Sequence, residues 1–366
     1  MPSEDHVGRP SPGTALRRGW TTGACATAAT KAALTAILTG RFPDPVTITL
    51  PKGQTPSFPL AEEWSGGETA SAAIVKDAGD DPDVTHGATI RATVSRSTTG
   101  SGVLFAAGPG VGTVTKPGLP IPPGEPAINP VPRDMMRGVV HDLCNTYDAA
   151  PDWRIEIGID GGAELAAKTW NPRLGIIGGL SVLGTTGVVN PFSCASWIHS
   201  IHRGVDVARA AGLERIIAAT GSTSEAAARS VHPNVPEIGL IDMGDFAGGL
   251  LKYLRVYPVP HLTIAGGFAK LTKLAQGALD LHSARSQVDF RALATLSPDQ
   301  TVAERISAAN TAAEGLSIAT GSGINLAERV AQGALSTATD TLRGAPVAVE
   351  VIVTDRAGTI VARAER

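Results

Sequence analysis

Three apolar runs in the second half of the chain each lead through a glycine-containing turn into a helical pattern. RIIAATG (215–221) is followed by STSEAAARS, EIGLIDMG (237–244) by DFAGGLLKYL, and HLTIAGG (261–267) by FAKLTKLAQGAL. Apolar strands that feed helices in this way are typical of a parallel sheet covered by helices on both faces. We start the pattern at RIEIGID (154–160), so the sequence predicts an α/β domain with a mostly parallel sheet over residues 151–366.

The last part of this domain has its own pattern. Two further helices are expected from about Thr301 and about Asn325. The C-terminal run VAVEVIVTDRAGTIVAR (347–363) predicts a β-hairpin with its turn near Asp355 to Gly358. This hairpin is able to pair with the sheet of either domain.

Residues 14–150 predict a different kind of domain, an α+β domain with a small sheet. TTGACATAATKAALTAIL (21–38) predicts a helix of small residues, for which Thr21 or Thr22 is a suitable N-cap. From Val46 to about Arg96, short apolar runs alternate with Pro, Gly and Asp clusters, which is typical of strands and turns. Residues 1–13 are rich in Pro, Ser and Gly, and we expect them to be a disordered N-terminus.

The segment GPGVGTVTKPGLPIPPGEPAINPVP (108–132) has no helical period and too many prolines for a central strand. We therefore predict a long, constrained loop. Its start resembles a dinucleotide-binding fingerprint only superficially, because Pro109 interrupts the glycines and no helix follows. We assign these glycines to a turn.

Composition limits the partners of this chain. Its 31 basic and 34 acidic residues give a net charge of −3, which offers no general attraction to nucleic acid or to an anionic membrane. No apolar run approaches the roughly 18 residues of a membrane span, and the start of the chain lacks the apolar region of a signal peptide. We expect a cytoplasmic protein that binds a small molecule and is able to form homo-oligomers.

Cysteine and histidine spacing argues against a disulfide framework or a metal centre. Cys25, Cys144 and Cys194 form no CxxC pair and are expected to be reduced. His199 and His202 stand three apart on a predicted helix, but no carboxylate motif accompanies them, so we expect no bound metal.

Ligands of parallel sheets bind at the carboxyl ends of the strands, where loops present free backbone N–H groups. This rule selects three strand ends. The residues expected to contact a ligand there are Thr220, Gly221, Asp242, Gly266 and Gly267. The alternative is that these residues only make tight turns, with Asp245 as the N-cap of its helix.

Glycines are densest in GIIGGLSVLGTTG (175–187), which matches no phosphate-binding motif. We expect its last turn, Gly184, Thr185, Thr186 and Gly187, to contact a ligand through the two hydroxyls, with simple packing as the alternative. His282 and Ser283 lie beside Arg285, and together these side chains are able to bind a carboxylate. A role in capping the C-terminus of the preceding helix explains the cluster equally well.

Several long runs resemble the cobalt-precorrin-5B C1-methyltransferase family, CbiD. They are LRRGWTTGACATAATKAA (16–33), the 108–132 segment with the following Arg133, and NPRLGIIGGLSVLGTTGVV (171–189). The residue strings 241–254, 265–289 and the C-terminal hairpin are similar too, so the resemblance covers nearly the whole chain. This sequence departs from the family pattern at Ala24, where Thr is expected, and at NPFSCASW (190–197).

The resemblance implies methylation of C1 of cobalt-precorrin-5B by S-adenosylmethionine, giving cobalt-precorrin-6A in anaerobic cobalamin biosynthesis. The glycine turn at 184–187 and the three strand ends would then hold the methyl donor, and the catalytic residues stay unassigned. The residues expected to contact the acidic tetrapyrrole are Thr21, Thr22, Lys116, Arg133, Arg173, Lys270, His282 and Ser283. For Lys116 we expect a position in one wall of the tetrapyrrole site, with a rigid covering of a sheet edge as the alternative.

Two other functions stay open at this point. Glycines and an acidic residue at strand ends also suit a nicotinamide-dependent corrinoid reductase, although no clean GxGxxG is present. A non-enzymatic tetrapyrrole carrier would need a macrocycle site but no donor site.

Overall fold

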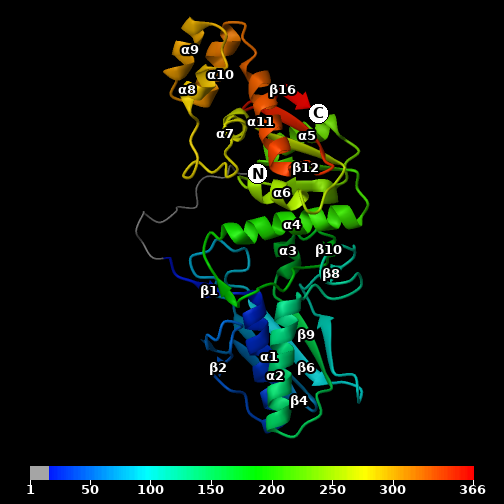
Figure 1. The fold of residues 1–366 in the computed structure, drawn as a ribbon. Coiled ribbons are helices and arrows are strands. Elements are labelled where there is room, and N and C mark those ends of the chain that lie inside the picture. Colours follow the sequence, from blue (N-terminus) through cyan, green and yellow to red (C-terminus); the bar gives the residue numbers. More distant parts are fainter. Residues whose placement is uncertain (1–15) are drawn as a thin grey trace. The chain divides into compact units, whose positions relative to one another are not determined.

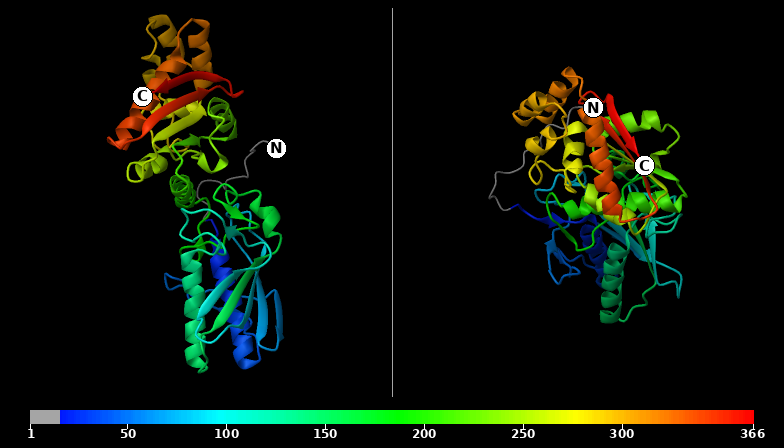
Figure 2. Two further views of the ribbon diagram at one scale, coloured as in Figure 1. Left: turned by 90° about the vertical axis from the view of Figure 1, so that its right-hand side faces the viewer. Right: turned by 45° about the horizontal axis from the view of Figure 1, so that its top comes forward.

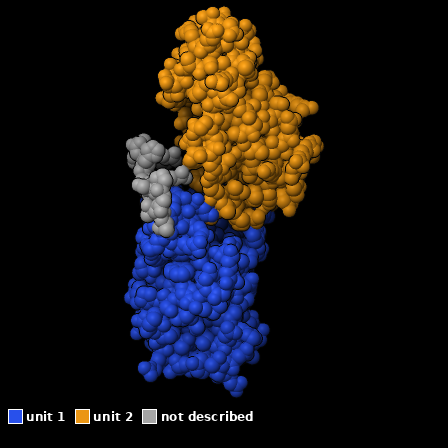
Figure 3. All heavy atoms as spheres, turned by 60° about the vertical axis from the view of Figure 1, so that its left-hand side comes forward, with its two compact units in different colours: residues 1–193 blue, residues 194–366 orange. Residues whose placement is uncertain are grey.

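The computed structural model describes residues 16–366, and the chain divides into two compact units between Ser193 and Cys194 (Figure 3). The disorder expected for residues 1–13 falls outside the described residues. The division lies later than the boundary at 150 and 151 that we expected from the sequence. The reason is the strand after residue 150, which belongs to the first unit.

Unit 1 contains a five-stranded sheet in the order β4-β5-β6-β9-β7. Its strands are β4 (Glu62–Gly66), β5 (Thr69–Val75), β6 (Thr89–Arg96), β7 (Val103–Ala107) and β9 (Trp153–Ile159). Strand β9 pairs antiparallel with β6 and parallel with β7. Taking RIEIGID as the first strand of the parallel sheet was therefore wrong, because its apolar alternation fits the neighbours in this mixed sheet equally well.

Two long helices, α1 (Thr22–Thr39) and α2 (Pro130–Thr146), lie side by side against this sheet (Figure 1). Helix α1 is buried along most of its length, and its small side chains allow β5, β6 and α2 to approach closely. Thr21 is its N-cap and accepts a hydrogen bond from the Ala24 N–H, as the sequence predicts.

Short elements make up the rest of unit 1. They are the antiparallel pairs β1 (Gly19–Trp20) with β11 (Val188–Val189), β2 (Val46–Thr47) with β3 (Ser57–Phe58), and β8 (Thr113–Val114) with β10 (Ile176–Ile177), and the helix α3 (Gly162–Ala166). The 108–132 segment contains β8 and folds around its own small core of Val114, Ile121, Ala127 and Ile176. It is a constrained loop up to Asn129, where α2 begins.

The glycines at the start of this loop serve backbone packing. A Cβ at Gly110 would lie 2.0 Å from the Ile159 carbonyl oxygen, and one at Gly162 or Gly179 would lie 2.3 Å from the Gly110 carbonyl oxygen. Three chain segments therefore approach closer than any side chain would allow. This agrees with assigning the GPGVGT glycines to a turn.

Unit 2 is the predicted α/β unit with a mostly parallel sheet, in the order β13-β12-β14-β15-β16. Strands β12 (Arg215–Ala219), β13 (Leu240–Asp242), β14 (His261–Gly267) and β15 (Ala348–Thr354) are parallel. The C-terminal hairpin is confirmed, since β16 (Ile360–Glu365) pairs antiparallel with β15 in this sheet. Its turn is held by the Asp355 carboxylate, which accepts from the N–H groups of Ala357 and Thr359.

Helices cover both faces of this sheet. Helices α4 (Cys194–Ala210), α6 (Ala247–Leu254), α7 (Phe268–Ala275) and α11 (Leu326–Leu342) share the larger core, and α5 (Ser222–Val231) packs on the other face. The short helix η1 (Glu237–Gly239) precedes β13. Helices α8 (Phe290–Ala294), α9 (Gln300–Ser307) and α10 (Ala312–Gly321) form a separate group between α7 and α11 (Figure 2).

The face under α5 carries a buried carboxylate, Glu350 of β15. Its side chain accepts hydrogen bonds from His232 Nε2 at 2.6 Å, from the Thr263 hydroxyl at 2.8 Å and from Arg363, and Arg215 Nη1 lies 3.5 Å away. Burial by itself raises the pKa of Glu350, but these hydrogen bonds outweigh burial and hold the pKa below its ordinary value of 4.5. The small apolar core on this face is therefore completed by a charge cluster.

Replacing Glu350 tests this cluster. A carboxyl whose pKa is lowered by folding stabilises the protein above pH 4.5, and this contribution is lost as the pH falls through the lowered pKa. We expect Glu350→Gln to lower the free energy of unfolding of unit 2 at neutral pH by about 3 kcal/mol, because it leaves three basic groups around a neutral amide. The variant should also lose less stability than wild type on acidification below pH 4.5.

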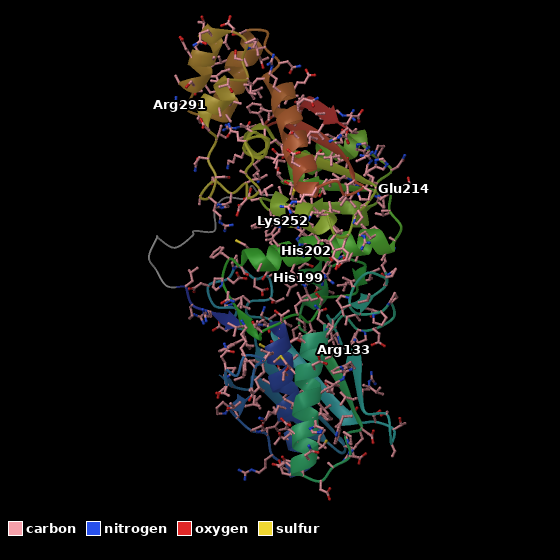
Figure 4. All side chains as sticks on the ribbon, viewed as in Figure 1. Arg133, His199, His202, Glu214, Lys252 and Arg291 are labelled. Atoms are coloured by element: carbon pink, nitrogen blue, oxygen red, sulfur yellow. The ribbon has the colours of Figure 1, made fainter. Side chains whose placement is uncertain are left out.

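Urea unfolding followed by hydrogen–deuterium exchange of peptides from residues 194–366 measures unit 2 selectively, whereas tryptophan fluorescence would also report the four tryptophans of unit 1. Glu214→Gln is the control, because Glu214 is exposed (labelled in Figure 4). Equal stability and equal acid sensitivity of the two variants would contradict the stabilising role of Glu350.

Candidate functional site

The three predicted strand ends of unit 2 lie next to one another, because β12 is the central neighbour of β13 and β14. The backbone continues the pairing beyond the strands. Met243 N–H donates to the Ala219 carbonyl at 2.9 Å, and Thr220 N–H donates to the Ala265 carbonyl at 2.9 Å. Thr220, Asp242 and Gly266 are thus brought to one edge of the sheet, as the sequence predicts from the strand-end rule.

Lys270, in the first turn of α7, joins two of these strand ends. Its ammonium donates to the Thr220 carbonyl at 3.0 Å and lies 3.2 Å from Asp245 Oδ1. Asp245 is not a helix N-cap, because α6 begins after Phe246 and has no side-chain cap. The ion pair fixes a positive and a negative group at the same edge of the sheet.

A loop over residues 277–288 borders this edge. Leu281 is fully buried, its N–H donates to the Asp245 carbonyl at 2.8 Å, and its own carbonyl accepts from the Lys273 ammonium at 2.7 Å. Gln276 joins the two ends of the loop. Its side-chain amide donates to the Asp289 carbonyl and accepts from the Asp289 N–H. This loop is therefore anchored to the strand ends and is not a simple connector.

The predicted residues His282 and Ser283 lie in this loop. His282 N–H donates to Asp280 Oδ1, and Asp280 also pairs with Arg285. Burial raises the pKa of Asp280, but the hydrogen bonds from Arg285 and His282 outweigh it and the pKa is lowered. The alternative of a helix C-cap does not hold, because α7 ends at Ala275 with Gln276 as its C-cap.

Two glycines leave open backbone at the sheet edge. Gly221 precedes α5 and Gly267 precedes α7, and a Cβ at either position would meet nothing within 4 Å. Gly266 differs, because its Cβ would meet Leu271 and Thr220 side chains at 3.0 Å. Backbone N–H groups at the starts of these helices are accessible to an anionic or hydrogen-bonding ligand.

Unit 1 contains the other predicted donor-binding turn, residues 184–187. Thr21 N–H donates to the Gly187 carbonyl at 3.0 Å, and Gly23 N–H donates to the Leu183 carbonyl at 2.8 Å. A Cβ at Gly184 would lie 2.2 Å from Thr21 Oγ1. The turn thus packs tightly against the start of α1, while Thr185 is exposed and the Thr186 hydroxyl bonds to the backbone of Val188 in its own turn.

The contacts of Thr21 and Thr22 are mostly structural. Thr21 caps α1, and Thr22 is buried in its first turn.

The predicted carboxylate-binding cations of unit 1 have unlike surroundings. Arg133 binds inside the proline-rich loop, to the carbonyls of Ile128 and Pro126 and to the Glu125 carboxylate, so its guanidinium stabilises that loop. Figure 4 places Arg133 in the first turns of α2. Arg173 lies over the Trp170 ring at 5.3 Å.

Lys116 is the exposed cation of this region. Its aliphatic stem packs on Gly175, and within residues 16–366 its ammonium has no hydrogen-bond or ion-pair partner. Pairing of β8 with β10 brings Lys116 beside the segment that carries Arg173.

His199 and His202 lie on α4 (Figure 4). His202 stacks on Tyr253 with ring centroids 3.9 Å apart, and its Nε2 lies 3.2 Å from the Gly249 carbonyl. Burial lowers the pKa of both histidines. Among residues 16–366 no three His, Cys, Asp or Glu side chains come together as metal ligands.

Sequence reasoning missed Lys273, Asp280 and Trp197. Lys273 is buried, and Trp197 donates from its indole to the Asp242 carbonyl at 3.2 Å. Only the pairing of strands and the path of the 277–288 loop bring these side chains to the sheet edge. A lysine at a helical position otherwise predicts a solvated charge.

Fold and site define a two-unit protein whose second unit presents the carboxyl ends of a mostly parallel sheet, the edge at which the sequence predicts a ligand. A family model described as CbiD matches residues 9–191, and one described as the CbiD C-terminal domain matches residues 280–365. The chain belongs to the CbiD family. No helix within residues 16–366 has the length and apolar character needed to cross a membrane.

The curated relatives are similar over nearly their whole length. The chain is 63% identical to a protein of Brucella anthropi and 62% identical to one of Brucella canis, each over 352 residues and 95% of both chains. Both are named cobalt-precorrin-5B C(1)-methyltransferase. A solved structure of a cobalamin biosynthesis protein (cbiD) from Archaeoglobus fulgidus is 27% identical, with a TM-score of 0.39 over 74% of this chain and 83% of that chain.

Gly184→Ala tests how tightly the 184–187 turn is packed. Gly184 has φ +131°, and the added Cβ would meet Thr21, so both backbone strain and a clash with the N-cap of α1 oppose the substitution. We expect the free energy of unfolding of unit 1 to fall by roughly 2–4 kcal/mol. Thermal unfolding followed by circular dichroism measures the change.

The matched control is Gly178→Ala. Gly178 has φ +88°, but a Cβ there meets nothing within 4 Å, so only the backbone cost of about 1 kcal/mol applies. Equal losses for the two variants would mean that contact with Thr21 does not matter.

Proposed function

We propose that this protein is a methyltransferase of cobalamin biosynthesis that methylates C1 of cobalt-precorrin-5B to give cobalt-precorrin-6A. The observation that carries the proposal is the 63% identity, over 95% of both chains, to a protein named for this activity. The match covers 95% of the 366 residues, so it extends across both units.

We propose S-adenosylmethionine as the methyl donor, bound at the strand-end edge of unit 2. The donor supplies a methyl group on a sulfonium, which a ring carbon of the tetrapyrrole displaces. The surroundings support this ligand. The carboxylates of Asp242 and Asp245 suit its ribose hydroxyls and its ammonium, and the open backbone at Gly221 and Gly267 lets its adenosine approach.

Lys270 has a positioning role in this proposal. Because it binds both Thr220 and Asp245, it holds the ends of β12 and β13 in one arrangement before any ligand arrives. Such preorganisation lowers the entropy lost on binding. The residues of the chain then contribute alignment and exclusion of water, which together account for several kcal/mol of a displacement barrier.

The acidic substrate requires cations, and unit 1 offers Lys116 and Arg173 for its carboxylates. Lys116 is the better candidate, because its ammonium is exposed and its stem is fixed on Gly175. Arg133 is the weaker candidate, because its guanidinium is engaged inside its own loop. We place the enzyme in the cytoplasm.

The deciding experiment incubates the purified protein with methyl-labelled S-adenosylmethionine and cobalt-precorrin-5B. We expect label to reach C1 of the macrocycle and S-adenosylhomocysteine to form in equal amount, with no consumption of NADPH. Folded protein that transfers no label to authentic substrate would refute the proposal. Binding of NADPH without binding of S-adenosylhomocysteine would favour a reductase, and binding of the tetrapyrrole alone would favour a carrier.

Lys116→Met tests whether the tetrapyrrole and the methyl donor bind to different residues. We expect binding of the tetrapyrrole to weaken about tenfold, because a charge-assisted hydrogen bond to a carboxylate is lost. Binding of S-adenosylhomocysteine should stay unchanged. Isothermal titration of both ligands measures this, with Lys252→Met as the control because Lys252 is also an exposed lysine. Equal losses for both ligands, or none for either, would remove Lys116 from the substrate site.

A further inference from the structure

A cavity of about 440 Å³ in unit 2 lies between α7, α8 and α11. Its volume falls within the range of small-molecule sites, roughly 300–1,000 Å³. Its apolar walls include Ala275, Ala278, Ala292, Leu293, Leu296 and Val330. Nothing in the donor site described above uses this space.

A buried lysine, Lys273, is among the residues that line the cavity. Its side chain is only 8% exposed, and within residues 16–366 its ammonium donates one hydrogen bond, to the Leu281 carbonyl. An ammonium has three N–H donors, so two are left for a ligand or water. Burial lowers the pKa of Lys273, and the carboxylates of Asp245 and Asp280 offset this only in part. A ligand carboxylate would compensate for the lost hydration.

The lining includes a second cation, Arg329 of α11. Its side chain is exposed, and it has no hydrogen-bond or ion-pair partner in the described part of the chain. Arg329 also lines an adjoining hollow of about 530 Å³. The acidic group in the cavity is Asp289, whose Oδ1 already accepts from the N–H groups of Arg291 and Ala292. The cavity lining therefore holds two cations and one acid, and the adjoining hollow adds the carboxylate of Glu328.

We propose that this cavity receives a carboxylate-bearing side arm of the tetrapyrrole substrate, with Lys273 and Arg329 as the cations of its lining. The inference rests on the proposed function, because it takes the acidic tetrapyrrole as the ligand. Alkyl arms that end in a carboxylate match apolar walls that include a cation. The adjoining hollow gives room for the edge of the ring from which the arm extends.

The test uses the full-length protein and cobyrinic acid, a corrinoid whose side arms are free carboxylates, with its fully esterified form as the uncharged counterpart. We expect cobyrinic acid to bind and the ester to bind at least tenfold more weakly. Arg329→Gln should weaken the binding of cobyrinic acid about five- to tenfold and leave the binding of the ester unchanged. Arg305→Gln, at an exposed arginine of α9 outside both hollows, should change neither.

Two more variants test the interior. Lys273→Met should abolish the preference for the acid over the ester, but its buried ammonium also holds Leu281, so this variant can misfold. Ala292→Phe avoids that difficulty, because Ala292 is exposed on α8 and a phenyl group there fills the cavity from outside. We expect it to block cobyrinic acid at unchanged stability, while Ala313→Phe at an exposed position of α10 has no effect.

Several outcomes would overturn the cavity assignment. They are no binding of cobyrinic acid, equal binding of acid and ester, or equal behaviour of the cavity variants and their controls. Methyl transfer and binding of S-adenosylhomocysteine are measured on the same preparations. If both persist in wild type while the cavity variants behave as their controls do, this inference fails and the proposed function stands. If wild type transfers no methyl group and binds no S-adenosylhomocysteine, the proposed function itself has failed.

Discussion

Unit 1 depends on the close approach between the start of α1 and the turn at residues 184–187. Two backbone hydrogen bonds, from Thr21 and Gly23 to Gly187 and Leu183, tie the first and last segments of the unit together. They form only because the helix has small side chains and the turn has glycine at its tightest point. Because its side chains are small, this buried helix packs with its backbone close to the neighbouring elements. An added atom would therefore disturb several of these contacts at once.

Unit 2 meets a different constraint, because a parallel sheet must be covered on both faces. The face under α4, α6, α7 and α11 is apolar throughout, whereas the face under the single helix α5 has few apolar side chains and a buried Glu350. The carboxylate is tolerated because basic groups and a hydroxyl saturate both of its oxygens. On this face a single helix covers only part of the sheet, and hydrogen bonds and ion pairs to Glu350 take the place of apolar packing.

The same sheet brings the residues of the proposed donor site together at its carboxyl edge. Strand order places three helix starts together, and Lys270 and the anchored 277–288 loop then fix the distances between them. The loop also ties Lys273 to Leu281, so the strand-end site and the cavity between α7, α8 and α11 share one structural support. If the proposed donor site and the proposed acid-binding cavity both belong to unit 2, this shared support would help to align the two reactants.

The sequence by itself determined the helix of small residues with its cap at Thr21, the parallel sheet with strand ends at Thr220, Asp242 and Gly266, and the C-terminal hairpin. These features are local, because each depends on the period of apolar residues and on turn chemistry within a few positions. Tertiary structure alone decided that β9 joins the first sheet, that Asp245 pairs with Lys270 instead of capping a helix, and that Arg133 binds its own loop. It also decided that Lys273 is buried beside a cavity. The physical reason is that an apolar strand or a charged side chain is compatible with many partners, and only the packing of distant segments selects one of them.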